Sequence, residues 1–168
     1  MHRQGHAFTK LVLFMLMMAM TSMACLFSGI SVDDTDLDVT VTLSESTVNR
    51  LLRNSVLEQD EDNLFVDITS IDMRPGLIRV FGTYTTSDGS TVPGSADVSF
   101  SAKDGLLHAE ITAVDIAGLD VSHPRITHIN DVMARAFAEE ASDTDEVEFI
   151  SVNITDDTME ITVRVSLQ

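Results

Sequence analysis

The stretch TVPGSADVSFSA, residues 91–102, alternates apolar and polar positions along its whole length. The apolar or small residues of one parity are Val92, Gly94, Ala96, Val98, Phe100 and Ala102. Because successive side chains of a β-strand point to opposite faces, this pattern predicts a strand with one face on an apolar core and the other in water. Sheets with this pattern are typically antiparallel.

The turns that flank this strand predict neighbours on both sides. SDG at 87–89 and KDG at 103–105 are hairpin signals, since both residues of an Asp-Gly pair accept positive φ. RPG at 74–76 is a further turn. The apolar runs between these turns predict three more strands of an antiparallel meander, at 64–73, 77–85 and 106–116.

Two of these strands change their apolar face midway. The change falls between Ile68 and Ile71 in one strand, and between Ile111 and Val114 in the other. A β-bulge, which adds one unpaired residue to a strand, or a strong bend would bring both halves to the same face. We therefore expect a sheet that curls.

A helical pattern precedes the meander. Thr42 and Glu45 have the spacing of a capping box, with Thr42 as the cap. Apolar residues then recur at intervals of three and four, which predicts an amphipathic helix over 43–59.

A second helix, expected over 124–141, begins in the densest polar cluster, DVSHPRITHIND at 120–131. His123 and His128 are five residues apart, which is not the spacing that places two metal ligands on one helical face. Ser122 or His123 as a cap, with Pro124 in the first turn, explains the cluster without chemistry. We expect no catalytic residue, no metal site and no cofactor.

Strands at 37–41, 147–154 and 158–167 complete the pattern. The resulting order is β-α-β-β-β-β-α-β-β. It predicts an α+β fold, in which a curved antiparallel sheet of six to seven strands packs against two amphipathic helices. The length of residues 37–168 suits one domain with one core.

The N-terminus has the layout of an export signal. Arg3 and Lys10 lie in a short basic opening, residues 11–20 are uncharged and apolar, and TSMA precedes Cys25, the only cysteine. SMAC at 22–25 is similar to the lipobox of bacterial lipoproteins, whose cysteine is lipidated after the preceding bond is cut. Ser22 stands where those proteins usually have leucine.

These features predict a signal peptide over 1–24 and lipidation of Cys25, with the domain on the outer face of a bacterial membrane. Two alternatives stay open. One is plain secretion after the same cut. The other is an uncleaved anchor, because residues 11–30 carry no charge and twenty residues can cross a bilayer.

The rest of the chain is strongly acidic. Without residues 1–24 it has 8 basic and 27 acidic residues, which excludes the basic footprint that nucleic-acid binding requires. The run SVDDTDLD at 31–38 lacks the glycine and closing glutamate of a helix-loop-helix calcium loop. We interpret residues 25–36 as a solvated acidic tether between the lipid and the domain.

VTVTLSESTVNRLL at 39–52, the DG-L turn and VDIAGLDVSHP at 114–124 resemble the YpmS-type and LmeA-type bacterial envelope proteins. Those families are similar in outline to tubular lipid-binding domains, in which a long helix lies in a curved sheet around an acyl chain. The resemblance implies an apolar groove but assigns no individual ligand contact. From the apolar spacing of the predicted helices and strand, the groove candidates are Leu51, Leu52, Val98, Phe100, Ile129 and Met133. Ordinary core packing is the alternative for the same residues.

We therefore expect a membrane-anchored, non-catalytic module that binds a lipid or another apolar envelope molecule. A surface-displayed scaffold domain, whose acidic exterior contacts a protein, is the alternative. The sequence does not identify that protein partner.

Overall fold

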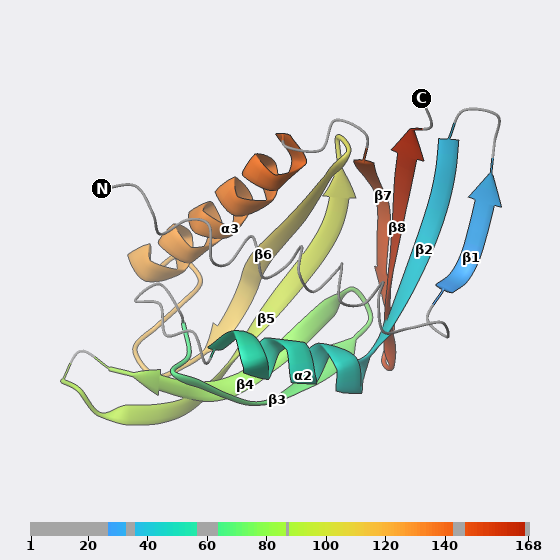
Figure 1. Cartoon of the computed structure of the whole chain (residues 1–168). Helices are drawn as coiled ribbons and strands as arrows, with labels where there is room; N and C mark the ends of the chain where they lie inside the picture. Colours follow the sequence, from blue (N-terminus) through green and yellow to red (C-terminus); the bar gives the residue numbers. More distant parts are fainter. Residues whose placement is uncertain (1–26, 33–35, 57–63, 87, 143–146, 167–168) are drawn as a thin grey trace.

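The computed structural model describes residues 27–32, 36–56, 64–86, 88–142 and 147–166 (Figure 1). The elements in chain order are β1 (Phe27–Val32), β2 (Asp36–Ser44), α2 (Glu45–Val56), β3 (Asp67–Arg74), β4 (Leu77–Thr85), β5 (Thr91–Lys103), β6 (Leu106–Asp115), α3 (Pro124–Ser142), β7 (Val147–Ile154) and β8 (Thr158–Ser166). The predicted α+β class is confirmed, and so is the predicted order of elements from β2 to β8.

The strands form two antiparallel sheets, whereas the sequence predicted one curved sheet. Sheet A has the strand order β1-β2-β8-β7, and sheet B has the order β3-β4-β5-β6 (Figure 1). Sheet B is a meander of consecutive hairpins, as expected. Sheet A unites distant parts of the chain, because β2 pairs with β8 over its whole length. The sequence cannot show this division, since it depends on long-range pairing and not on local alternation.

Strand β1 is an addition to the predicted order. It pairs with β2 in a register that sets Phe27 opposite Val41 and Val32 opposite Leu37. The sequence interpretation of residues 25–36 as a tether is therefore wrong for residues 27–32, and the folded domain begins earlier than residue 37. Pairing with β2 overrides the weak strand signal of this segment, which directly continues the apolar N-terminal run.

Both predicted changes of face are β-bulges of sheet B. The register of β3 against β4 shifts between Ile68 and Ser70, and the register of β6 against β5 shifts where Ile111 faces Val98. Each shift returns the second half of the strand to the core side, so that Ile71 is buried like Ile68. The bulges also increase the local twist, which curls the sheet.

The two sheets meet along β7. The backbone N–H of Phe149 donates to the carbonyl of Gly105 in the β5–β6 turn, and the N–H of Gly76 in the β3–β4 turn donates to the carbonyl of Ile154. The predicted hairpin geometry of KDG is confirmed, since Asp104 and Gly105 both have positive φ. The turns of sheet B thus cover the outer edge of β7. Both sheets contribute side chains to one buried apolar cluster.

Helix α2 begins at Glu45, two residues later than the capping box indicated. Thr42 lies in β2 opposite Glu160, so its backbone is extended and it cannot cap the helix. Ser44 is the cap, because its hydroxyl oxygen accepts a hydrogen bond from the N–H of Thr47 at 3.3 Å. Residues 57–59 of the predicted helix lie outside the described residues.

Candidate apolar binding site

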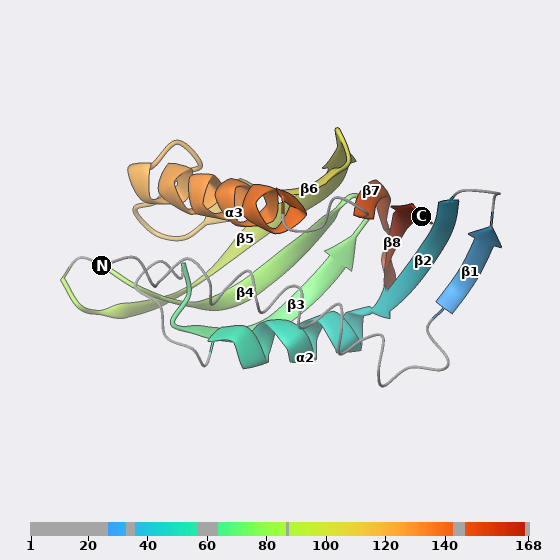
Figure 2. The same cartoon turned by 45° about the horizontal axis from the view of Figure 1, so that its top comes forward.

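Helices α2 and α3 are attached to opposite edges of sheet B. Helix α2 packs on β3 and, less extensively, on β2, while α3 packs on β6. Figures 1 and 2 show the two helices flanking sheet B on either side of the central strands β4 and β5. Because β3 and β6 are the edge strands of this sheet, their outer backbone groups need partners from elsewhere.

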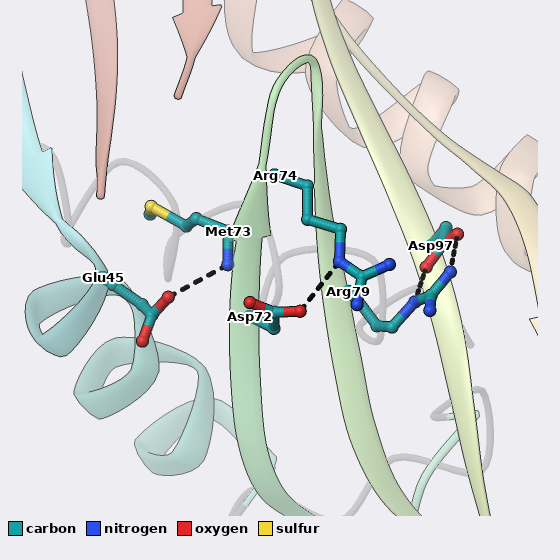
Figure 3. A network of polar contacts seen from close by, with 6 residues as sticks. All are labelled: Glu45, Asp72, Met73, Arg74, Arg79 and Asp97. Atoms are coloured by element: carbon teal, nitrogen blue, oxygen red, sulfur yellow. Dashed lines mark hydrogen bonds and ion pairs between the residues drawn. The ribbon is translucent and has the colours of Figure 1, made fainter. Parts of the chain in front are cut away.

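One polar side chain from each helix forms hydrogen bonds with the outer backbone groups of an edge strand. Glu45 Oε2 accepts a hydrogen bond from the N–H of Met73 at 3.0 Å (Figure 3). On the other edge, Asn130 Oδ1 accepts from the N–H of Ile111 at 2.8 Å, and Asn130 Nδ2 donates to the carbonyl of the same residue at 3.3 Å. Neither contact is predictable from the sequence, because no local pattern pairs a helix residue with the edge of a distant strand.

The six candidate groove residues come from three elements: Leu51 and Leu52 from α2, Val98 and Phe100 from β5, and Ile129 and Met133 from α3. All six are partly buried. Five of them, the exception being Leu51, pack against the single buried cluster. Helix α2 contacts β3 and β2, and α3 contacts β6, so the candidates on each helix adjoin the core from different edges of sheet B and part of each side chain stays accessible.

The small residues of the central strands are in tight contact with neighbouring side chains. A Cβ atom on Gly82 would lie 2.8 Å from the ring of Phe65, and one on Gly94 would lie 2.4 Å from Ile116. Phe65 and Ile116 are both buried. The glycines therefore allow these two side chains to lie directly against the sheet, and the space beside Gly94 is filled by Ile116.

Asn49 is a polar residue within the apolar side of α2. It follows the buried Val48 and precedes Leu52 by three residues, so it lies on the side of the helix that faces the core. Its Oδ1 atom is buried and has no hydrogen-bond partner among the described residues. The sequence signal was present, as an asparagine ahead of two leucines, but sequence alone does not reveal whether the amide is paired.

The outer face of sheet B carries ion pairs. Arg79 binds Asp97 through two hydrogen bonds, Nε to Oδ1 at 2.6 Å and Nη2 to Oδ2 at 2.7 Å (Figure 3). Arg74 Nε binds Asp72 Oδ2 at 2.8 Å on the same face. The hydrogen bonds from Arg79 lower the pKa of the Asp97 carboxyl, although burial acts in the opposite direction. These opposite charges stabilise one another across the neighbouring strands.

Sheet A has a similar polar outer face. Arg164 forms two hydrogen bonds with Asp38 at 2.8 and 3.0 Å, and the hydroxyls of Thr40 and Thr162 are hydrogen-bonded at 3.0 Å. The hydrogen bonds from Arg164 lower the pKa of the Asp38 carboxyl. The polar residues of β2 and β8 are thus engaged with each other across the strands.

The histidine cluster is a helix start. His123 Nδ1 accepts a hydrogen bond from the N–H of Arg125 at 3.2 Å, and α3 begins at Pro124, as the capping interpretation predicted. Asp120 Oδ1 accepts from both the N–H and the hydroxyl of Ser122, which lowers the pKa of the Asp120 carboxyl. Within the described ranges, no three His, Cys, Asp or Glu side chains are arranged to hold a metal ion.

The predicted signal peptide and Cys25 lie outside the described residues. None of the helices in the described part of the chain is long and apolar enough to cross a membrane. Comparisons with protein-family models, with curated proteins and with solved structures gave no match.

Proposed function

We propose that this chain is an extracytoplasmic lipoprotein whose domain binds a lipid or another apolar envelope molecule without catalysing a reaction. The observation that carries this proposal is the set of partly accessible apolar side chains on α2, β5 and α3. Partly accessible side chains from these three elements adjoin one continuous core. Ligand sites in proteins are largely apolar and contain few polar groups, and this region has that character.

The attachment of the helices supports this proposal. Each helix is held at a different edge of sheet B, by Glu45 in one case and by Asn130 in the other. Because these hydrogen bonds fix each helix to a strand edge, the apolar contacts of Leu52 and Met133 can rearrange around a ligand while the helices stay in place. Met133 suits this role, because its unbranched side chain adapts to irregular neighbours.

Strand β1 supports cleavage over the uncleaved anchor. If Phe27 and the next five residues pair with β2, the uncharged stretch available to a membrane helix shrinks from residues 11–30 to residues 11–26. Sixteen residues of helix span about 24 Å, which is less than the hydrocarbon core of about 30 Å. A cut before Cys25, followed by lipidation, has no such length requirement.

The anchor is tested by the mass of the mature N-terminus in wild type and in Cys25→Ser. We expect a diacylglycerol-sized increment that is lost in the variant. An N-terminus that begins with Met1 would establish the uncleaved anchor instead.

Ligand binding is tested by native mass spectrometry of the mature chain purified from membranes. We expect a bound apolar molecule, or uptake of one from phosphatidylcholine vesicles. Met133→Asp should abolish uptake, because a carboxylate in the apolar region is costly to bury. Val121→Asp is the matched control, since Val121 is 46% exposed in the loop before α3. A wild-type chain that carries no lipid and takes up none would refute the binding function.

A further inference from the structure

We infer that Asn49 recognises a hydroxyl group on the apolar ligand of this domain. The inference rests on the proposed function and specifies the ligand class: a lipid with a hydroxyl donor close to its acyl chain. Its starting point is the Oδ1 atom of Asn49, which is buried without a hydrogen-bond partner among the described residues.

An unpaired buried acceptor destabilises a folded domain. The amide oxygen loses its hydrogen bonds to water and gains none in return, a cost that native proteins rarely retain without a function. Val48 beside it is 7% exposed and Leu52 packs on the core, so an apolar residue would suit this position better. The asparagine therefore breaks the pattern of its own helix, which is typical of functional sites.

The surroundings determine which donor suits Asn49. An ammonium group would have to be buried beside apolar side chains, which is very costly. An amide donor brings its own carbonyl, which would need a further partner in the same region. A hydroxyl rotates freely to direct its single proton at Oδ1, so it satisfies the asparagine with the least additional polar surface.

The location connects this donor site to the apolar region. Asn49 and Leu52 are three residues apart on α2 and thus are neighbours on the helix surface. A ligand chain that contacts Leu52 can therefore bring a hydroxyl near its end within reach of Asn49. The arrangement combines an apolar wall with one polar group that fixes orientation, as ligand sites commonly do.

The test uses two probes with the same hexadecyl chain and oxygen, of which only the first has a donor: hexadecan-1-ol and hexadecyl methyl ether, in which a methyl group replaces the hydroxyl proton. They are offered together at equal concentration from phosphatidylcholine vesicles. The ratio of the two complexes is measured by native mass spectrometry of the full mature chain in nanodiscs. We expect wild type to prefer the alcohol about tenfold, which corresponds to one buried hydrogen bond. In Asn49→Leu the ratio should fall to about one while total uptake persists.

Asn153→Leu is the control, because it makes the same replacement at an exposed position of β7 and should keep the wild-type ratio. A second readout is the urea midpoint of the ligand-free chain, which should rise in Asn49→Leu because the unpaired acceptor is removed.

A wild-type ratio near one, a preference that persists in Asn49→Leu, or a large loss of stability in that variant would each overturn the inference. The first result would mean that only water pairs with Asn49, and the last that the amide is already satisfied. If wild type takes up neither probe, the proposed function fails and this inference fails with it.

Discussion

The side-chain amide of Asn130 bridges both backbone polar groups of Ile111, accepting from its N–H and donating to its carbonyl. Ile111 is only 4% exposed, so neither group can turn to water if the amide is removed. We expect Asn130→Ala to lower the free energy of unfolding by about 2–6 kcal/mol, at about 1–3 kcal/mol for each of the two unpaired buried groups. The measurement is urea denaturation of the mature chain.

A local readout separates this effect from general destabilisation. In native-state hydrogen exchange the Ile111 amide should lose protection first in Asn130→Ala. Asp131→Ala, at the exposed neighbouring position on α3, should leave that amide protected. Equal protection of Ile111 in wild type and Asn130→Ala would show that the bridge does not hold the edge of β6.

Glu45 provides the corresponding tie for α2. Its carboxylate accepts from the N–H of Met73, a residue that is 1% exposed. Glu45→Ala should lower the free energy of unfolding by about 1–3 kcal/mol, and Glu45→Gln should lose less because an acceptor remains.

Glu110→Ala is the matched control for Glu45→Ala, because it removes one carboxylate from an exposed position of β6. If both alanine variants lose the same stability in urea, the effect is one of net charge and not of the Met73 contact.

The ion pair between Arg79 and Asp97 predicts a pH dependence of stability. Since the pKa of Asp97 is lower in the folded chain than its ordinary value of 3.8, the pair contributes its full stability above about pH 5. That contribution is lost as the pH falls through the lowered folded pKa. In wild type the free energy of unfolding should therefore decrease as the pH falls below about 5, and in Asp97→Asn this decrease should be smaller. The measurement is denaturation at several pH values.

Arg79→Gln is the complementary variant. It removes the hydrogen bonds that are the main cause of the lowered pKa of Asp97. Because Asp97 is only 7% exposed, burial then raises the pKa of its carboxyl. Its loss of stability relative to wild type should be larger at pH 7 than at pH 3. A wild-type slope that is unchanged in Asp97→Asn would contradict the assignment.

A lipid on Cys25 predicts how the domain faces the membrane. One residue separates Cys25 from Phe27, the first residue of β1, and these two residue steps span at most about 7 Å. Phe27 pairs near the end of β2 that leads to α2, so the β7–β8 turn should lie close to the bilayer. Because Cys25 is the only cysteine, a thiol placed at Asp156 or at Ser166 would be the single free one in the lipidated chain.

A fluorophore on Asp156→Cys should be quenched by quenchers in the lipid headgroups more strongly than one on Ser166→Cys, at the opposite end of sheet A. Both positions are exposed, so labelling should not disturb the core. Stronger quenching at Ser166→Cys would contradict the predicted orientation. Reaction of Cys25 itself with the label would show that it is not acylated.

Local chemistry in the sequence predicted most of the meander. The bounds of β4 are those expected, and the two changes of face at Ile68 and Ile111 are bulges. The bounds of β7 in sheet A are also those expected. These features follow from alternation and turn residues, which act over a few positions. The start of α3 was equally predictable, because Pro124 is the first helical residue and the His123 side chain caps the helix.

What the sequence did not predict depends on distant contacts. The division into two sheets follows from the pairing of β2 with β8 and from the turns that cover β7. The same pairing keeps Thr42 in the strand, so that Ser44 caps α2.

For the candidate site, the apolar residues on α2, β5 and α3 were identifiable from periodicity. The unpaired Oδ1 of Asn49 was not, because whether a buried amide is paired depends on every neighbour around it.

The most direct test of the apolar binding region is photo-crosslinking with a fatty alcohol that carries a diazirine in the middle of its chain. The binding proposal predicts saturable crosslinks to Leu52, Phe100 or Met133, competed by unlabelled hexadecan-1-ol and reduced in Met133→Asp. Crosslinks that do not saturate, or that map to the polar outer faces around Arg79 and Arg164, would contradict it.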